Sequence, residues 1–315
     1  MRGHPFLRRR KDLVDMLIPP RRIALSGGGV RAIAHLGALS HLEKKGMLKA
    51  VREYIGVSAG AFVGFTLMLG YTLSELKTLC SLFDFSLVRK LDPEAALEFP
   101  VTFGLDNGEN LVKLLHSLLR IKKQSTTLTF GEWKTKYPTA IELRCFATDL
   151  FTTKPREFSA AKTPNICIVD ALRASMALPV YFTPVKDPET GHMLVDGGIL
   201  HNSPLAFLAH HERSSAIGIS FSYDFTKVDA IDDIMTFFSQ IFACYYIPRT
   251  NHVHEQNRGN CILIPCGNVP AWNFEASREE REEIIDLGEK AAELFCDTHS
   301  NNTVEQLPIR RYSVS

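Results

Sequence analysis

The stretch IALSGGGVRAIAHLGALSHLEKKGMLKAVREYIGVSAG, residues 23–60, decides the fold class of this 315-residue chain. The apolar run at 23–25 leads into three glycines, and apolar residues then recur at helical spacing as far as Gly46, a residue suited to ending a helix. Residues 50–58 form a second strand-like run that ends at a serine between glycines, and a helix is predicted at 59–69. Strand, glycine turn and helix in alternation are typical of a parallel sheet.

The mixed pattern continues downstream without a clear linker or repeat. Strand-like runs lie at 139–159, 192–204 and 214–222. Helices are predicted at 73–83, 109–119, 169–176 and 234–248, and a last one from a capping box of Ser277 and Glu280. The sequence therefore predicts an α/β fold with a mainly parallel central sheet.

The simplest domain organisation is one α/β unit with additions at both ends. We expect a basic N-terminal arm at 1–20, the main domain at 21–215, a C-terminal helical elaboration packed on it at 216–298, and a frayed tail at 299–315. The cluster Arg8-Arg9-Arg10-Lys11 in the arm is either solvated or in contact with anionic lipid.

Composition narrows the class of protein. The net charge of +1 gives no field that would attract nucleic acid, so no nucleic-acid partner is expected. The seven cysteines include no C-x-x-C pair, which favours reduced thiols in the cytoplasm. We see no secretory signal, and the longest apolar run, at 61–69, is too short to span a bilayer. We expect a cytoplasmic protein of unspecified oligomeric state, with any membrane association peripheral.

The serine at the second glycine turn carries the first functional hypothesis. In Gly56-Val57-Ser58-Ala59-Gly60, a sharp strand-to-helix turn would expose the Ser58 hydroxyl, and Gly56 and Gly60 would remove colliding side chains. The N–H groups that open the next helix would face developing negative charge. These features fit a nucleophilic serine. The alternative is a serine that only caps a buried helix.

The triple glycine Gly27-Gly28-Gly29, followed by Arg31, is the second feature. Successive glycine N–H groups can form a nest for an anion. A dinucleotide loop would place a third fingerprint glycine where this chain has Ala32, and an acidic residue at the end of the second strand. That strand ends at Ser58 instead, which favours an oxyanion loop with Gly28 and Gly29 as backbone donors over a nucleotide-binding module.

The third feature is Asp196-Gly197-Gly198. A carboxylate at the end of a strand and before two glycines can project into an open cleft. The alternative is an ordinary aspartate in a turn.

Together these motifs resemble the patatin-like phospholipase family. That family has a glycine-rich loop followed by Arg or Lys, a G-x-S-x-G elbow and a downstream D-G-[GA], and all three occur here in that order. ASMALPVYFTP at 174–184 and FATDL at 146–150 resemble two further family segments. The resemblance covers about residues 22–210. Ala32 departs from the pattern, since the family usually has glycine there.

The resemblance implies a three-layer α/β sandwich and a Ser-Asp dyad. Ser58 would attack an ester of a phospholipid, lysophospholipid or other acyl lipid, Asp196 would accept its proton, and Gly28 and Gly29 would hold the oxyanion. An acyl-enzyme would follow, without cofactor or metal. The alternative is a catalytically silent lipid-binding protein of the same fold.

Other polar residues have competing interpretations. His201 is the best rival base, whereas His35 fits a packed helix residue. His252 and His254 alternate as on a strand, and their spacing from Cys261 and Cys266 fits no standard zinc site. Arg31 could hold a lipid phosphate or form a salt bridge. No dense carboxylate loop suggests calcium.

Access to a lipid requires an apolar surface, and two stretches could supply it. The aromatic helix at 234–248 is either a lid or interfacial helix, or a core helix against the sheet. The stretch FDFSLVRKL at 83–91 is a candidate for the lip of the pocket.

Overall fold

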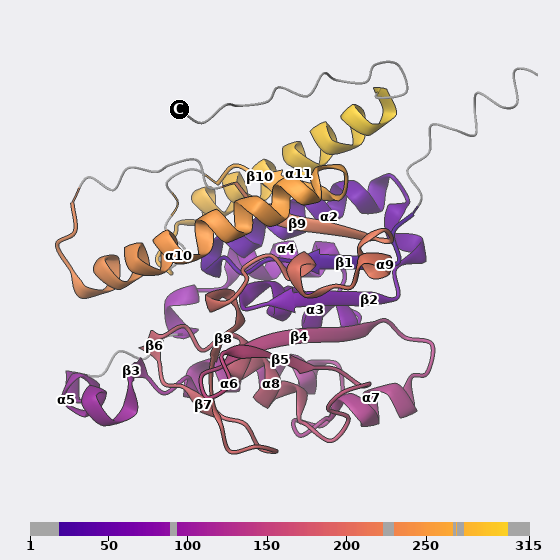
Figure 1. Ribbon diagram of the computed structural model, residues 1–315. Helices are drawn as coiled ribbons and strands as arrows, with labels where there is room; N and C mark the ends of the chain where they lie inside the picture. Colours follow the sequence, from indigo (N-terminus) through magenta and orange to yellow (C-terminus); the bar gives the residue numbers. More distant parts are fainter. Residues whose placement is uncertain (1–18, 89–92, 223–229, 267–268, 270–273, 302–315) are drawn as a thin grey trace, which may run out of the picture.

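The computed structural model describes residues 19–88, 93–222, 230–266, 269 and 274–301 (Figure 1). Most of the predicted basic arm, the tail from residue 302 and the end of the FDFSLVRKL stretch lie outside these ranges. The predicted α/β class is confirmed: helices flank an eight-stranded sheet with strand order β10-β9-β1-β2-β4-β8-β7, and β5 pairs with β4.

Five strands of the sheet are parallel, as the alternating pattern predicts. They are β1 (Arg22–Leu25), β2 (Glu53–Val57), β4 (Glu142–Asp149), β9 (Ala216–Phe221) and β10 (Cys261–Ile264). Beyond β4 the sheet turns antiparallel through β5 (Lys154–Phe158), β7 (Val185–Lys186) and β8 (Met193–Asp196). Residues 216–298 thus contribute two strands of the sheet as well as helices.

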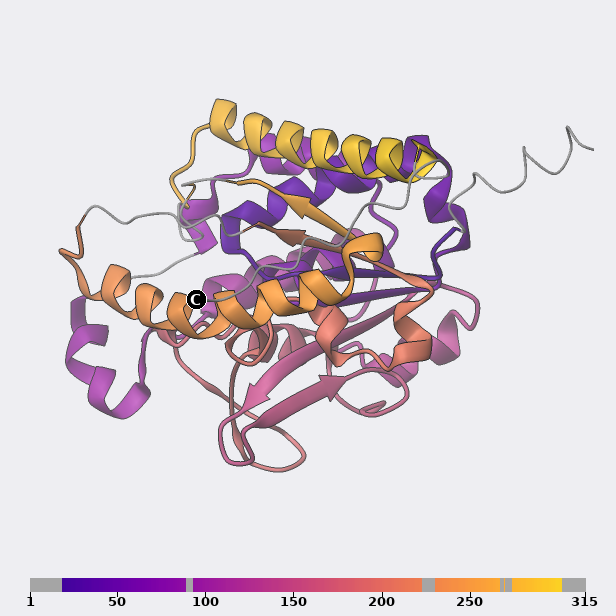
Figure 2. The ribbon, with the colours of Figure 1, turned by 45° about the horizontal axis from the view of Figure 1, so that its top comes forward.

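Side chains alternate between two cores, one on each face of the sheet. Ile23 and Leu25 of β1 enter the larger core, and Ala24 between them enters the smaller one. The larger core lies under helices α2 (Ala34–Lys44), α3 (Ala59–Met68), α4 (Leu73–Leu82), α6 (Glu109–Ile121), α8 (Ile168–Ser175) and α11 (Arg278–Asn301). The smaller core is covered by the 3-10 turn η5 (Pro204–Phe207) and by Val253 of α10 (Ile234–Gln256). Both faces of the sheet are therefore covered, which gives three layers (Figures 1 and 2).

Helix α11 lies directly on α2 (Figure 2). The predicted capping box is present: the Ser277 N–H donates to Glu280 Oε2 at 2.6 Å, and the Glu280 N–H donates to Ser277 Oγ at 3.2 Å. A Cβ at Gly288 would lie 1.9 Å from the Ala34 carbonyl oxygen, and one at Gly37 would lie 1.8 Å from that of Ile285. The two helices can approach this closely only because both positions lack a side chain.

Helix α10 corrects two predictions. The sequence predicts its end at Pro248, but the helix continues to Gln256 with Pro248 inside it. His252 and His254, interpreted as alternating on a strand, therefore lie on a helix. A proline removes only one hydrogen-bond donor from a helix, and the buried side chains of Thr250 and Val253 hold the following turns against the sheet.

Smaller elements complete the fold. Strands β3 (Gly104–Asp106) and β6 (Val180–Phe182) form a separate parallel pair. The remaining short helices are α5 (Pro93–Thr102), α7 (Phe130–Lys136) and α9 (His210–Arg213). Among the described helices, none is long and apolar enough to cross a membrane.

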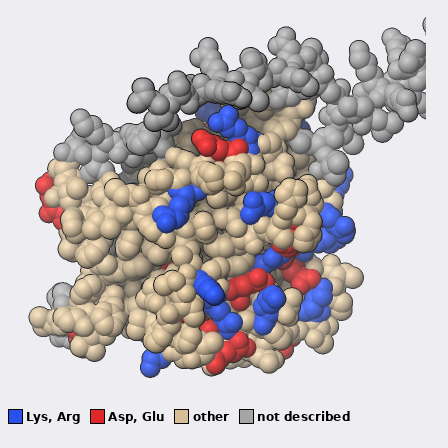
Figure 3. Space-filling view, in the orientation of Figure 1, with Lys and Arg blue, Asp and Glu red and all other residues tan. Residues whose placement is uncertain are grey.

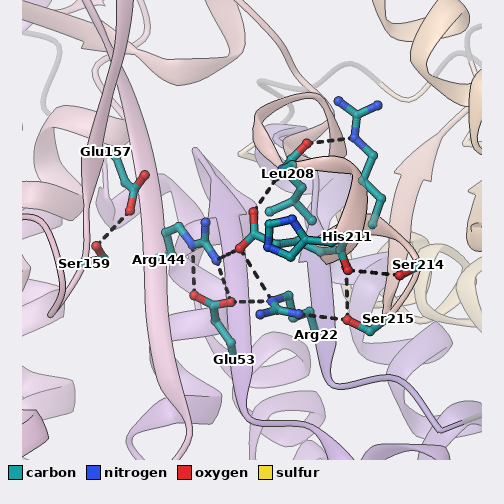
Figure 4. Close-up of polar contacts among 12 residues, drawn as sticks. Arg22, Glu53, Arg144, Glu157, Ser159, Leu208, His211, Ser214 and Ser215 are labelled. Atoms are coloured by element: carbon teal, nitrogen blue, oxygen red, sulfur yellow. Dashed lines mark hydrogen bonds and ion pairs between the residues drawn. The ribbon is translucent and has the colours of Figure 1, made fainter.

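Charged side chains join the strands at their amino ends (Figure 4). Arg144 Nη2 lies 2.8 Å from both Glu53 and Glu212, and Arg22 Nε lies 3.0 Å from Glu53. This network binds β1, β2 and β4 together at the end of the strands opposite to the glycine turns. It leaves the carboxyl ends free for the candidate site.

Candidate active site

Ser58 occupies the turn between β2 and α3 in a conformation that needs close support. Its φ of 53° and ψ of −129° are unusual for a residue with a side chain. A Cβ at Gly56 would lie 2.3 Å from the Ala61 backbone, and one at Gly60 would lie 2.2 Å from the Leu25 carbonyl oxygen. The two glycines therefore permit the tight turn that presents the serine hydroxyl.

Asp196 reaches Ser58 because β2 and β8 flank the same strand. Val57, the last residue of β2, is paired with Phe146 of β4, and Asp196, the last residue of β8, is paired with Ala147. The Ser58 side chain lies close enough to the Asp196 carboxylate to lower its pKa. The structure thus brings together two side chains separated by more than a hundred residues.

Burial gives Asp196 the electrostatics of a base that works near neutral pH. Desolvation raises the pKa of its carboxyl group to about 6, although hydrogen bonds from Ser58 and from the Gly198 N–H, at 2.7 Å, act in the opposite direction. A carboxylate with a raised pKa accepts a proton more readily than an ordinary aspartate.

The glycine loop is fastened to the turn that follows Asp196. The Gly27 N–H donates to the Asn202 carbonyl at 3.3 Å, and Asn202 Nδ2 donates to the Gly27 carbonyl at 3.0 Å. A Cβ at Gly28 would lie 2.3 Å from the ring of Phe221, so the ring supports the loop directly. Within the described part of the chain, the Gly28 N–H donates to no other backbone group. Gly28 and Gly29 line the same cavity as Ser58.

That cavity has a volume of about 250 Å³ and is mainly apolar. Its only charged side chains among the described residues are Arg31 and Asp196. The walls are aliphatic and aromatic side chains from several elements, including Leu36, Phe62, Val63, Leu111, Leu114, Met176, Leu178, Phe182 and Phe274. Such a lining fits a hydrocarbon chain better than a polar ligand.

The two stretches expected to form an apolar surface both reach the cavity. Phe238, Phe242 and Tyr246 of α10 line it, and so do Phe85 and Val88 of the FDFSLVRKL stretch. The amino-terminal half of α10 therefore covers the cavity, while its carboxyl-terminal half packs on the sheet. The predicted segment 234–248 thus lines the cavity, and the buried residues Thr250 and Val253 lie beyond its predicted end.

The remaining sequence candidates lie outside the reacting centre. His201 is not among the residues that line the cavity, and burial together with Arg249 lowers its pKa. Burial lowers the pKa of His35 to about 4, and its Nε2 lies 2.9 Å from the Ser26 carbonyl oxygen. His254 bonds to Ser220 Oγ at 2.9 Å. No group of three or more metal-ligating side chains occurs among the described residues.

Arg31 does not form the salt bridge that was one of its two predicted roles, within the described residues. Its Nε donates to the Val269 carbonyl at 2.5 Å, and it forms no ion pair there. The side chain borders the cavity and ties the glycine loop to the segment between β10 and α11.

Sequence reasoning did not single out the residues that support the dyad. Ser175 accepts a hydrogen bond from the Ser58 N–H at 3.0 Å, and Thr148 Oγ1 donates to the Asp196 carbonyl at 2.9 Å. Both lie inside stretches already quoted, ASMALP and FATDL, so a signal was present. The pairing itself is visible only in the fold.

The fold and the site define an α/β protein with a serine elbow, a buried aspartate and a glycine loop around an apolar cavity. The family model described as Patatin-like phospholipase matches residues 23–209. The chain belongs to the patatin-like phospholipase family, as the sequence motifs predict.

Relatives and solved structures agree with this family. The chain is 27% identical to "Probable lipid hydrolase 463L" of Invertebrate iridescent virus 6, over 87% of this chain and 88% of that protein. It is also 27% identical to YqhO of Bacillus subtilis, covering 86% of this chain and 96% of that protein. The match to patatin-like phospholipase domain-containing protein 6 of Mus musculus, at 27% identity, covers 68% of this chain but only 14% of that longer protein.

The fold is similar to that of VipD from Legionella pneumophila, with a TM-score of 0.55 and 18% identity over 89% of this chain and 67% of that one. It is also similar to the type III effector ExoU, with a TM-score of 0.51 and 18% identity over 90% of this chain and 53% of that one. Family membership and the viral relative support lipid hydrolase activity.

Proposed function

We propose that this protein hydrolyses fatty-acyl esters of phospholipids or lysophospholipids, with Ser58 as nucleophile and Asp196 as proton acceptor. The observation that carries the proposal is the meeting of the Ser58 side chain with a buried carboxylate whose pKa is raised to about 6. A serine is a weak nucleophile unless a nearby base takes its proton, and this geometry supplies that base.

The reaction would proceed in two balanced steps. Ser58 Oγ attacks the ester carbonyl while its proton moves to Asp196, and the negative charge develops on the former carbonyl oxygen. When the C–O bond of the ester breaks, the alcohol leaves with the proton from Asp196, and the acyl group remains on Ser58. Water then attacks the acyl-enzyme and gives its proton to Asp196, and Ser58 regains its hydroxyl as the fatty acid leaves.

The backbone near Gly28 supports the charged intermediate. Gly28 and Gly29 line the cavity beside Ser58, and Arg31 of the same loop is the only cation among the described residues that line it. Backbone donors aimed at a developing oxyanion contribute about 10²–10³ each to the rate. The apolar walls would hold the acyl chain and exclude water from the dyad.

Two alternatives are weaker. A nucleotide-binding module would use the glycine loop for phosphates, but the Gly27 N–H already donates to Asn202, and one arginine is the only lining cation in the described cavity. A silent lipid-binding protein would use the same apolar walls. The meeting of a serine with a buried aspartate of raised pKa favours hydrolysis over that alternative.

A fluorophosphonate probe tests the proposal, because it reacts with activated serines only. The parent should be labelled at Ser58, as located by mass spectrometry of its peptides, and Ser58→Ala should not. Ser239→Ala is the matched control, since Ser239 lines the same cavity but bonds only within its own helix, to the Thr236 carbonyl at 2.8 Å. It should label like the parent. If the parent takes up fatty acid but no probe, the lipid-binding alternative is correct.

A further inference from the structure

Helix α10 has a second apolar face beside the one that lines the cavity. Ile234, Phe237, Ile241 and Tyr245 recur at three- and four-residue spacing and are exposed to solvent, Phe237 and Ile241 by 48% and 47%. The next residue after each of the last three, at 238, 242 and 246, lines the cavity. One helix therefore contacts the proposed substrate site on one side and leaves an apolar stripe exposed on the adjoining side.

Helix α5 adds to this surface. Leu97 and Val101, one turn apart, are 83% and 81% exposed. In two views the amino-terminal half of α10 and helix α5 lie at the same end of the molecule (Figures 1 and 2). We name the exposed side chains of these two helices the apolar rim: Ile234, Phe237, Ile241, Tyr245, Leu97 and Val101.

Few charged side chains lie at the apolar rim: Glu98, beside Leu97, is exposed, and the Arg249 guanidinium stacks on the Tyr245 ring at 3.7 Å from its centroid. The fifteen residues from Ile234 to Pro248 contain no Lys, Arg, Asp or Glu, and the residues just before them, Asp232 and Asp233, are acidic and exposed. Figure 3 shows many of the charged side chains of this face at the lower right, with acidic side chains also at the left edge and basic ones near the middle. A surface of this kind would enter the apolar part of a lipid interface rather than bind anionic headgroups.

We propose that the apolar rim docks on the surface of a phospholipid bilayer, driven by insertion of apolar side chains rather than by charge attraction. The choice of a bilayer rests on the proposed function, because the neighbouring face of α10 borders the cavity that would receive a lipid from that bilayer. Tyr245, at the end of the stripe, has the amphipathic ring that favours the headgroup level.

The test measures binding without chemistry. Vesicles of diether phosphatidylcholine have no net charge and contain no carboxylic ester that the enzyme could cleave, so binding to them is independent of acyl-ester hydrolysis. The parent chain and Ser58→Ala should both co-sediment with these vesicles. Binding should persist when NaCl is raised from about 0.1 M to about 0.5 M, because screening weakens attraction between charges only.

Variants locate the contact. Phe237→Asp with Ile241→Asp should weaken vesicle binding at least about tenfold, because charges are costly in the apolar interface. Leu294→Asp is the matched control: Leu294 is 66% exposed and belongs to the carboxyl-terminal half of α11, a segment that lies towards the other end of the molecule (Figure 1), so binding should not change. The double variant should still hydrolyse a short water-soluble ester like the parent and lose activity on vesicle phospholipid.

Four results would overturn the proposal. The parent could fail to bind neutral vesicles, or the double variant could bind them as well as the parent. Binding that needs anionic lipid and disappears with salt would assign the contact to basic residues instead. A dimer that dissociates in the double variant, without any vesicle binding, would make a second copy of this chain the partner. If the vesicles are bound as expected but no hydrolysis is detected, only the proposed function is wrong.

Discussion

The side chain of Ser175 accepts a hydrogen bond from the backbone N–H of Ser58 at 3.0 Å. The same hydroxyl donates to the Phe146 carbonyl at 2.7 Å, so one buried side chain links the serine turn to β4, the strand next to Asp196. This link holds Ser58 at its positive φ of 53° and fixes the height of its hydroxyl relative to the aspartate.

Ser175→Ala tests that link. It leaves a buried N–H and a buried carbonyl without this partner, so we expect a loss of about 1–3 kcal/mol in the free energy of unfolding. The rate of fluorophosphonate labelling should fall about tenfold or more, since small misplacements of a reacting group are costly. Ser40→Ala removes a buried hydroxyl that bonds only within α2, to the Leu36 carbonyl at 2.7 Å, and should label at the parental rate. If Ser175→Ala and Ser40→Ala are labelled at equal rates, Ser175 does not position Ser58.

The raised pKa of Asp196 predicts the pH dependence of the reaction. The ionised carboxylate is the base, so the labelling rate should rise with pH and reach half its maximum near pH 6. Asp196→Asn should lower the rate by about 10²–10⁴ and remove this dependence. His201→Gln should leave the profile in place. A profile that vanishes in His201→Gln instead would make that histidine the base.

Folding stability should respond to the same group in the opposite direction. Because the folded-state pKa of Asp196 lies above the ordinary value of 3.8, its contribution to stability is present at low pH and is lost as the pH rises through about 6. Urea unfolding at several pH values, compared between the parent and Asp196→Asn, isolates this contribution. We expect the variant to gain stability relative to the parent between pH 4 and about 6; a constant difference would contradict the raised pKa.

The contact between Gly28 and Phe221 predicts a rescue. Gly28→Ala would place a Cβ 2.3 Å from the ring, which would displace the glycine loop. We expect the labelling rate to fall by about 10²–10³, the cost of one lost oxyanion donor. Phe221→Leu makes room for the new methyl group, so the double variant should recover part of the loss, with Phe221→Leu alone as the reference. If the double variant is labelled no faster than Gly28→Ala, the Phe221 ring does not determine the position of the glycine loop.

The crossing of α2 and α11 predicts a large effect far from the site. Gly288→Ala would force a Cβ to within 1.9 Å of the Ala34 carbonyl oxygen, and two helix backbones would have to separate. We expect a loss of about 2–4 kcal/mol in unfolding free energy, measured by urea denaturation. Gly259→Ala is the control, since a Cβ there meets nothing within 4 Å and should be nearly neutral. Similar values for both variants would contradict the tight crossing.

Much of the fold could be predicted because its signals are local. Apolar runs of strand length and helical spacing depend on neighbours in the chain, and the glycines at 27–29, 56 and 60 mark turns. The order of three motifs then indicated the family. Short elements such as β3 and β6, three residues each, carry too few residues for a periodic pattern and were not predicted.

The course of α10 could not be read from its residues. Its first half is apolar on every side, so no periodicity distinguishes the face that lines the cavity from the face left exposed. Pro248 suggested that the helix ends there, but buried contacts of the residues after Pro248 keep the chain helical as far as Gln256.

The sequence by itself determined which residues stand at sharp turns: a serine, an aspartate and three glycines. Only the tertiary structure decided that they meet. Ser58 follows β2, which is parallel to β4, and Asp196 ends β8, which is antiparallel to β4. The two registers bring both residues beside Ala147 of β4. The registers of two strands on either side of a third are long-range pairings, and these depend on the packing of the whole sheet rather than on any local preference.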